Sequence, residues 1–175
     1  MNRLLGLSGS LRRGSYNTKL LKEAARLCAP DQFDLADLNL PLFNEDLEAE
    51  GLPEAVQTLC DQIAAADALV FSTTEYNKGP SGVMKNALDW ISRVRPMRTE
   101  GKPAAVLSAA AGMAGGQRAK SHMYLYLIPF KVRLVLDPEV NLGGAGSKFD
   151  DAGRLTDPGA EKFLGALMDN LKASI

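Results

Sequence analysis

Small polar residues, glycines and arginines gather directly after the first apolar run of the chain. The segment SGSLRRGSYN combines Gly9 with the hydroxyls of Ser10 and Ser15 and the amide of Asn17. Because this segment leads into a stretch with helical periodicity, its backbone N–H groups and the positive end of that helix would point at one place. Arg12 adds a full charge on a planar fork that suits phosphate. The segment therefore predicts an anion site.

Two common phosphate-binding motifs fit this segment less well. The interval from Gly9 to Gly14 is like that of a P-loop, but Ser15 stands where the lysine of a nucleotide triphosphatase belongs. The dinucleotide pattern G-x-G-x-x-G is absent. A flavin mononucleotide (FMN) phosphate, which needs many neutral donors and little metal chemistry, fits better. The alternative is an ordinary polar turn between a strand and a helix, because serine and asparagine caps are common.

A second polar segment, TTEYNKGPSG, follows the third apolar run. In this segment the ring of Tyr76 is expected to border a flat heterocycle, and Asn77 to hydrogen-bond its polar edge or a sugar-alcohol chain. Glu75 taken alone is typical of a solvated loop acid, and we do not assign it as a general base.

A third segment, SAAAGMAGGQRA, begins at Ser108 and is rich in small residues. Gly112, Gly115 and Gly116 allow the backbone to lie close against a ring. Its N–H groups would then contact the polar edge of that ring and favour the negative charge that develops on reduction. A flexible surface connection is the alternative for this segment by itself.

Five short apolar runs precede helical stretches, which is the pattern of a parallel sheet covered on both faces. The runs are about Arg3 to Leu7, Phe33 to Asp37, Ala68 to Ser72, Ala104 to Leu107 and Val132 to Val135. This alternation predicts an α/β, flavodoxin-like doubly wound five-stranded parallel sheet of order 2-1-3-4-5. Strands 1, 3 and 4 are then neighbours, so all three polar segments leave from the same edge of the sheet.

Helices are predicted from apolar residues three and four positions apart. A helix from near Ser81 places Val83, Met84, Ala87, Leu88 and Ile91 on one face; a helix from Glu54 to Ala66 places Val56, Leu59, Ile63 and Ala66 inward; and a helix from Gly159 to Ala173 places Phe163, Leu167 and Leu171 inward. Leu38 to Pro53 is interpreted as a long polar loop, and the glycine-rich chain after Asn141 as irregular.

Composition limits the class of protein. A chain of 175 residues with 46% hydrophobic and 23% charged side chains predicts a single domain spanning residues 1–175. A net charge of −1 without a basic block argues against a nucleic-acid partner. Cys28 and Cys60 suggest neither a disulfide framework nor a zinc site. Without a leader or an apolar run near ~20 residues, we expect a cytoplasmic protein with no membrane role.

The three segments together resemble the NAD(P)H-dependent FMN reductase family, which includes bacterial quinone, chromate and azo-dye reductases. The resemblance rests on GSLR with Ser15 and Asn17, on EYN followed by KNALDW, and on GGQRA, and it extends to the late segment FDDAGRLTD. It covers nearly the whole chain. It implies bound FMN, with NADPH or NADH as co-substrate.

By this resemblance, each segment would contact one part of the flavin. The phosphate would be held by Ser10, Arg12, Ser15, Tyr16 and Asn17, in a loop that includes Gly9 and Leu11; the ribityl chain and ring by Glu75, Tyr76 and Asn77; and the isoalloxazine by Ser108 to Gly116, including Gly112 and Gly115. No side chain is expected to be catalytic, since the chemistry takes place at flavin N5, and no metal is expected.

The sequence departs from the family pattern in the second and third segments. A proline common before Glu-Tyr-Asn is Thr74 here, and the usual Pro-Gly is Ser81-Gly82. Ala109-Ala110-Ala111 stands where relatives often carry hydroxyls. With fewer side-chain donors in the third segment, weaker flavin affinity or a shifted potential is expected.

Members of this family are usually dimers or tetramers, so the resemblance implies a homodimer or homotetramer with the flavin near the interface. The apolar stretch from Met123 to Phe130 is compatible with an interface and equally with core packing. His122, the only histidine, is interpreted as a structural or surface residue.

The expected reaction is a ping-pong transfer in which NAD(P)H reduces the flavin, leaves, and is replaced by a small-molecule acceptor such as a quinone. The first rival is a flavodoxin-type electron carrier without NAD(P)H turnover, but such carriers are typically strongly acidic. A receiver-like module would need an acidic cluster after the first strand, which ends in Gly6-Leu7-Ser8. A phosphate-binding scaffold without flavin is the remaining rival.

Overall fold

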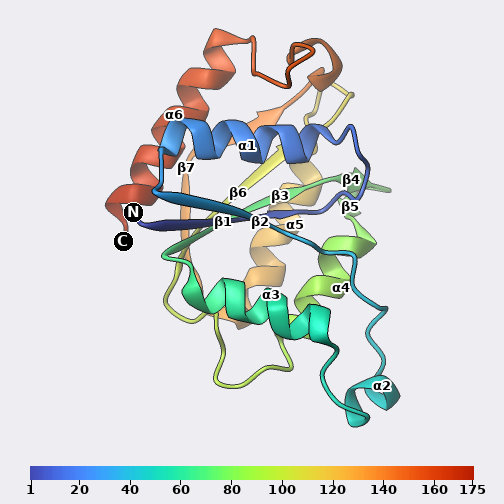
Figure 1. The fold of residues 1–175 in the computed structure, drawn as a ribbon. Coiled ribbons are helices and arrows are strands. Elements are labelled where there is room, and N and C mark those ends of the chain that lie inside the picture. The colour runs from blue at the N-terminus through green and yellow to red at the C-terminus, as the bar shows by residue number, and fades with distance from the viewer.

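A parallel sheet of five strands runs through the centre of the molecule in the computed structural model, which describes residues 1–175 (Figure 1). Its strands are β1 (Arg3–Ser8), β2 (Gln32–Ala36), β3 (Ala68–Thr73), β6 (Pro103–Ala109) and β7 (Arg133–Leu142). Their order is β2-β1-β3-β6-β7, and every neighbouring pair is parallel. The predicted order 2-1-3-4-5 and the α/β class are confirmed.

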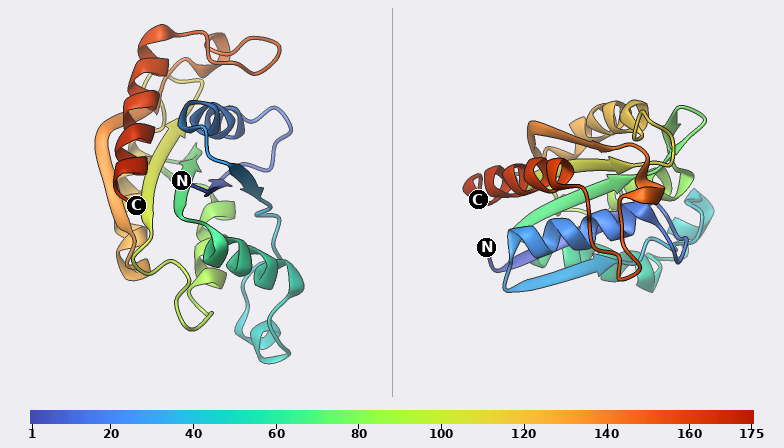
Figure 2. Two further views of the ribbon diagram at one scale, coloured as in Figure 1. Left: turned by 60° about the vertical axis from the view of Figure 1, so that its left-hand side comes forward. Right: turned by 90° about the horizontal axis from the view of Figure 1, so that it is seen from above.

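Helices cover both faces of the sheet (Figures 1 and 2). One face carries α1 (Tyr16–Cys28) and α6 (Pro158–Ala173), and the other carries α3 (Glu54–Ala65), α4 (Gly82–Ile91) and α5 (Gln117–Leu127). Each layer has its own apolar core, of 19 buried residues under α1 and α6 and 21 under α3, α4 and α5. No helix is both long enough and apolar enough to cross a membrane.

Two of the three inner strands, β3 and β6, are buried at every position. Continuous apolar runs of this kind are typical of parallel strands covered on both sides, which is why they could be recognised in the sequence. The edge strand β7 extends to Leu142, well beyond the predicted end at Val135. Its pairing with β6 shifts register between Ala105 and Leu107, opposite the segment that contains Pro138. Proline is tolerated in a strand where an edge strand is irregular. Because proline is otherwise untypical of strands, the second half of β7 could not be recognised from the sequence.

The prediction that Phe163 points inward from the last helix is wrong. Phe163 is 55% exposed, and the buried face of α6 consists of Leu164, Leu167, Met168 and Leu171. These four positions have the i, i+3, i+4, i+7 spacing of one helix face, and Phe163 lies about 100° away from Leu164.

The segment from Leu38 to Pro53 packs against the rest of the protein and contains the short helix α2 (Glu45–Ala49). Its interpretation as a long polar loop is therefore corrected. Leu38 is buried in the core, and Phe43 packs edge-on against the ring of Trp90. The indole N–H of Trp90 donates to the carbonyl of Pro41 at 2.8 Å. These contacts with α4 are long-range, so the local polarity of the segment could not reveal them.

A small antiparallel hairpin, absent from the prediction, stands beside the sheet and is formed by β4 (Glu75–Tyr76) and β5 (Gly79–Pro80). Its turn residues Asn77 and Lys78 both have positive φ, of 51° and 67°. Two consecutive left-handed residues form the kind of tight turn that joins two strands with a matching twist. The hairpin shapes the second polar segment at the functional edge of the sheet.

Candidate functional site

The three polar segments meet at one edge of the sheet, as the strand order predicts, and enclose a pocket of about 160 Å³. The pocket is lined by Ser10, Arg12, Ser15, Tyr16 and Asn17, by Thr74, Glu75 and Tyr76, and by Ala109, Ala110 and Ala111. An adjoining recess of about 470 Å³ adds Gly9 and Leu11 beside Ser10, Arg12 and Tyr76. Of the predicted site residues, Asn77, Ser108, Gly112, Gly115 and Gly116 line neither cavity.

The N-terminus of α1 opens into this pocket with unused donors. Ser15 is buried and caps the helix, its hydroxyl oxygen accepting the N–H of Thr18 at 3.2 Å, so its own proton remains free to donate. The N–H groups of Tyr16 and Asn17 have no acceptor within the protein. The first turn holds no acid, and Arg12 is exposed without an ion pair. This end of α1 is a positive pole suited to an anion.

The side chain of Asn17 is saturated by internal hydrogen bonds. Its amide nitrogen donates to the hydroxyl of Thr74 at 3.1 Å and to the carbonyl of Ala109 at 3.0 Å. Its oxygen accepts from the hydroxyl of Ser72 and from the N–H of Ala109, each at 2.9 Å. The predicted role as a side-chain donor to phosphate is therefore corrected: the amide ties the three segments together, and only the backbone N–H of Asn17 is free.

Glu75 is engaged with the start of the neighbouring helix α5. Its carboxylate accepts the N–H groups of Arg118 at 3.1 Å and of Ala119 at 3.3 Å. The N-cap residue of α5 is Gly116, which has no side chain to satisfy these donors. Glu75 thus caps α5 from another loop, and it also lines the pocket. It is not the solvated loop acid that its residue type suggested.

The third segment uses its glycines to pack on β6 and β7. A Cβ on Gly115 would lie 2.7 Å from the carbonyl carbon of Asn141, and one on Gly116 would lie 3.1 Å from the Cβ of Ser108. Both glycines also have positive φ, of 62° and 85°. Ser108 is fully buried and donates to the side-chain oxygen of Asn141 at 3.0 Å. The close approach predicted for these glycines is made to the protein itself, and Ala109–Ala111 face the pocket.

Two departures from the expected pattern, Thr74 and Ser81, have structural roles that the sequence did not disclose. The hydroxyl of Thr74 accepts from Asn17, which a proline could not do. Ser81 caps α4 by accepting the N–H of Met84 at 3.2 Å, and its hydroxyl donates to the carbonyl of Gly9 at 2.6 Å. These hydroxyls hold the first and second segments together.

A late segment of the chain reaches the site without having been predicted there. The ring of Phe149 stacks on that of Tyr16 with 6.3 Å between centroids and 2° between planes. A Cβ on Gly146 would lie 3.2 Å from the hydroxyl of Tyr16. These two contacts hold the ring of Tyr16 in place. At the rim of the pocket, in contrast, Tyr76 and Leu11 are 54% and 52% exposed. Exposed apolar groups at a rim are suited to a flat ligand.

An ion pair between a buried lysine and an exposed glutamate supports the third segment. Lys120 of α5 is 1% exposed, and its ammonium donates to Glu139 of β7 at 3.2 Å. Burial lowers the pKa of Lys120, while the hydrogen bond from Lys120 lowers the pKa of Glu139. Glu139 also accepts from Asn141 at 3.3 Å, and Asn141 in turn accepts from Ser108. This polar chain fixes the strand on which Gly115 packs.

Comparison with known proteins yields concordant matches. The family model for NADPH-dependent FMN reductase matches residues 2–147. An NAD(P)H-dependent FMN reductase of Pseudomonas aeruginosa is 46% identical over 164 residues, covering 93% of this chain and 89% of that protein. A quinone reductase of Pseudomonas putida is 40% identical over 165 residues, covering 92% of this chain and 88% of that protein.

Among solved structures, the flavoenzyme FerB, an NAD(P)H:(acceptor) oxidoreductase of Paracoccus denitrificans, superimposes with a TM-score of 0.88 at 32% identity. The match covers 99% of this chain and 98% of that one. The similarity in sequence and the similarity in structure both extend over the segments that form the pocket.

Proposed function

The chain belongs to the NADPH-dependent FMN reductase family, and on that basis we propose that it uses FMN to pass hydride from NADH or NADPH to quinones or similar small-molecule acceptors. The residues of this pocket would hold the flavin, which would supply the chemistry of hydride transfer between nicotinamide and acceptor. The protein's contribution is to bind, orient and polarise the flavin. The observation that carries the proposal is the N-terminus of α1, which presents unused donors to a pocket formed by three loops.

The donor set of the pocket fits the phosphate of FMN. The hydroxyl of Ser15, the N–H groups of Tyr16 and Asn17 and the guanidinium of Arg12 supply neutral and charged donors around one end of the pocket. A volume of about 160 Å³ is smaller than the ~300–1,000 Å³ of typical small-molecule sites. We therefore assign the enclosed part to the phosphate end and the open recess beside Tyr76 and Leu11 to the flat ring.

The backbone of the third segment has donors for the polar edge of that ring. Ala109 and Ala110 use their N–H groups internally, donating to Asn17 and to the carbonyl of Leu142. The N–H groups of Ala111 and Gly112 have no acceptor within the protein. Donors of this kind stabilise negative charge on a reduced ring. Because backbone groups supply this contact, the alanines that replace hydroxyl residues remain compatible with the proposed role.

The pocket offers no free carboxylate for proton transfer to the acceptor. Its only carboxylate, Glu75, is held by the N-terminus of α5. We propose that the proton taken up by the reduced acceptor comes from solvent, which reaches the open recess beside Tyr76. The reaction then depends on positioning, and single substitutions at the rim should change KM more than kcat.

The decisive experiment is a flavin titration of the purified apoprotein followed by steady-state kinetics. We expect bound FMN with a shifted visible spectrum, and continuous NADPH oxidation when a benzoquinone is added. Binding of FMN without NAD(P)H consumption would indicate an electron carrier instead. If the folded protein does not bind FMN at micromolar concentration, the proposed function is wrong.

We further propose that the protein is a homodimer or a homotetramer and that the α4–α5 face contributes to the interface. Leu125 and Ile128 are 62% and 69% exposed on that face, beside a recess of about 350 Å³ between the two helices. Leu125→Glu should lower the mass measured by light scattering, because it places a charge in the apolar contact. An unchanged mass would argue against this interface, and Phe163→Glu on the opposite face serves as the control.

A further inference from the structure

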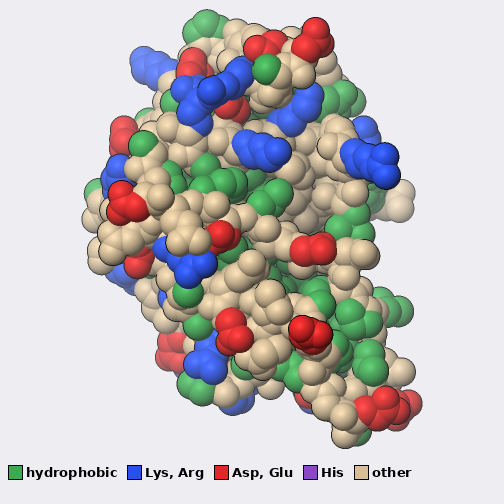
Figure 3. All heavy atoms as spheres, in the orientation of Figure 1, with side chains coloured by type: hydrophobic (Ala, Val, Ile, Leu, Met, Phe, Trp, Pro, Cys, Tyr) green, Lys and Arg blue, Asp and Glu red, His purple; other side chains and the backbone are tan.

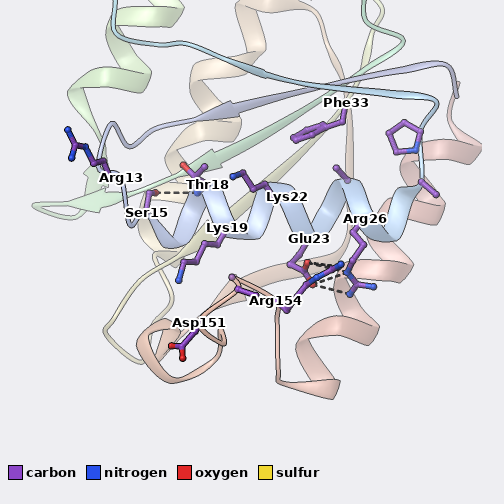
Figure 4. Close-up of a pocket in the computed structure, with 15 residues that line it drawn as sticks. Arg13, Ser15, Thr18, Lys19, Lys22, Glu23, Arg26, Phe33, Asp151 and Arg154 are labelled. Carbon is purple, nitrogen blue, oxygen red and sulfur yellow. Dashed lines mark hydrogen bonds and ion pairs between the residues drawn. The ribbon is translucent and has the colours of Figure 1, made fainter.

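A recess of about 600 Å³ lies outside the pocket described above, along the solvent side of α1 (Figure 4). Its floor is the narrow stripe of α1 that carries Thr18, Lys19 and Lys22. One wall contains Pro30 and Phe33, at the start of β2, and the other is the turn at residues 151–154. We call this recess the α1 trough.

The trough has a strong positive charge in a weakly acidic protein. Five basic and two acidic side chains line it, a formal excess of +3, whereas the whole chain has a net charge of −1. Arg13, Lys19 and Lys22 take part in no ion pair. Figure 3 shows Lys and Arg side chains gathered over the α1 side of the molecule. Three uncompensated cations in one recess favour an anionic ligand with more than one charge.

A buried acid fixes the far wall of the trough. Glu23 is 3% exposed and accepts from Arg26 at 3.0 Å, from Arg154 at 3.4 Å and from the N–H of Leu155 at 3.2 Å. Arg26 also pairs with Glu161 of α6. Hydrogen bonding to Glu23 raises the pKa of Arg26 further above its ordinary value. The turn at 151–154 is thereby held against α1, so the trough exists before any ligand arrives.

The trough lies next to the pocket proposed for the flavin phosphate. Ser15 lines both cavities, and the adjacent arginines divide between them: Arg12 lines the pocket and Arg13 the trough. From Ser15 to Lys22 the helix rises about 10 Å. A ligand whose first phosphate lies at the N-terminus of α1 can therefore extend along the helix past Lys19 to Lys22.

We propose that the α1 trough binds the adenylate half of flavin adenine dinucleotide (FAD), so that the protein accepts FAD as well as FMN. FAD is FMN extended from its phosphate by an adenosine monophosphate, and the trough begins where that phosphate is placed. Arg13, Lys19 and Lys22 would contact the second phosphate and the ribose. The half-buried ring of Phe33, beside Pro30, supplies an apolar wall for adenine. The proposal rests on the flavin site of the proposed function.

The test compares the affinities of FMN and FAD in equilibrium titrations of the apoprotein at fixed ionic strength. We expect wild-type protein to bind the two flavins with similar affinity. The double variant Lys19→Gln/Lys22→Gln should weaken FAD about tenfold, since it removes two phosphate contacts at a partly exposed site, and should change FMN less than about twofold. Lys162→Gln, which removes an exposed charge from neighbouring α6 outside the trough, should leave both affinities unchanged.

Three results would overturn the inference. The first is wild-type protein that binds FMN but not FAD. The second is a double variant that weakens FMN and FAD equally, which would mean that the lysines act only as a general positive field. The third is unchanged FAD affinity with a lower kcat/KM for NADPH but not for NADH, which would assign the trough to the 2′-phosphate of the co-substrate. In each case FMN binding and turnover test the proposed function separately.

Discussion

Polar residues around the pocket divide into those that hold the protein together and those that retain free groups for a ligand. Asn17 and Ser81 have their side chains committed to neighbouring loops. Ser15 and Arg12 keep donors that no protein atom accepts. Residue type alone does not separate the two groups, because a serine caps a helix in both cases. Substitutions in the first group should therefore affect stability, and those in the second should affect affinity.

Asn17→Ala tests the first group. It leaves the buried hydroxyl of Ser72 and both backbone groups of Ala109 without their partners. Each unsatisfied buried group costs about 1–3 kcal/mol, so the free energy of unfolding should fall by roughly 3 kcal/mol or more in urea denaturation. Asn39→Ala, at an exposed position without a side-chain hydrogen bond, should cost less than about 0.5 kcal/mol. Equal stability of the two variants would contradict the assigned role.

Arg12→Gln tests the second group. Removing the guanidinium should weaken FMN binding by about tenfold, because charge-assisted contacts to phosphate are the stronger ones, and should leave the unfolding midpoint unchanged. Fluorescence titration of the apoprotein with FMN measures the affinity. Arg13→Gln is the matched neighbour: it lines the α1 trough only, so FMN affinity should change less than about twofold. Similar losses in both variants would place the phosphate elsewhere.

At the scale of elements, helix ends carry much of the site. The N-termini of α1 and α4 are capped by their own serines, whereas α5 has Gly116 as its N-cap and depends on Glu75 from the β4–β5 hairpin. This arrangement ties the second segment to the third. It also explains why the hairpin, with only two residues in each strand, has a defined position beside the sheet.

Glu75→Ala should loosen the start of α5 without unfolding the protein. Loss of a helix cap costs about 1 kcal/mol, so amide hydrogen exchange at Arg118 and Ala119 should accelerate severalfold. Glu75→Gln, which retains an acceptor oxygen, should show a smaller increase. The amides of Thr18 and Met84, which their own serines cap, are internal controls. Unchanged exchange at α5 would mean that the carboxylate contributes nothing to the cap.

At the scale of the whole molecule, three surfaces differ in their chemistry. The carboxyl ends of β1, β3 and β6 carry the candidate flavin site, α1 carries the positive trough, and α4 with α5 carries the exposed apolar residues on the other face (Figure 2). Both chain termini lie at the end of the sheet away from the site (Figure 1). A ligand in the trough and a partner on the α4–α5 face would therefore not compete for space.

Acid stability is also a property of the whole molecule. Hydrogen bonds from Arg3 lower the pKa values of Asp34 and Asp67, which join β1 to its neighbours, and Lys148 lowers that of Asp157. Because these folded pKa values lie below the unfolded ones, the unfolded chain binds more protons in acid. The free energy of unfolding should therefore hold above about pH 4 and fall as the pH drops through the folded pKa values.

Denaturation midpoints measured between neutral pH and strong acid test this expectation. Asp67→Asn should lower stability at neutral pH and make the acid decline shallower, because one of the stabilised carboxylates is gone. Asp31→Asn, an exposed acid without a hydrogen bond to its side chain, should leave the decline as in the wild type. A decline in Asp67→Asn as steep as in wild type would contradict the assignment.

The sequence by itself determined the strand order and the meeting of three polar segments at one edge. Buried parallel strands are continuous apolar runs, and their order places the loops after β1, β3 and β6 side by side. The serine, arginine and glycine content of the first segment also pointed to a phosphate. These features follow from local composition and from a topology with few alternatives.

Only the tertiary structure decided which polar atoms are free. Asn17 and Glu75 have the residue types of ligand contacts, yet their partners lie 92 and 44 positions away along the chain, at Ala109 and Ala119. Two other features also depend on contacts between residues far apart in the chain. They are the packing of residues 38–53 on Trp90 and the extension of β7 past Pro138. A side chain's hydrogen bonds are shared among whatever groups the fold brings within about 3 Å, and no window of sequence contains that information.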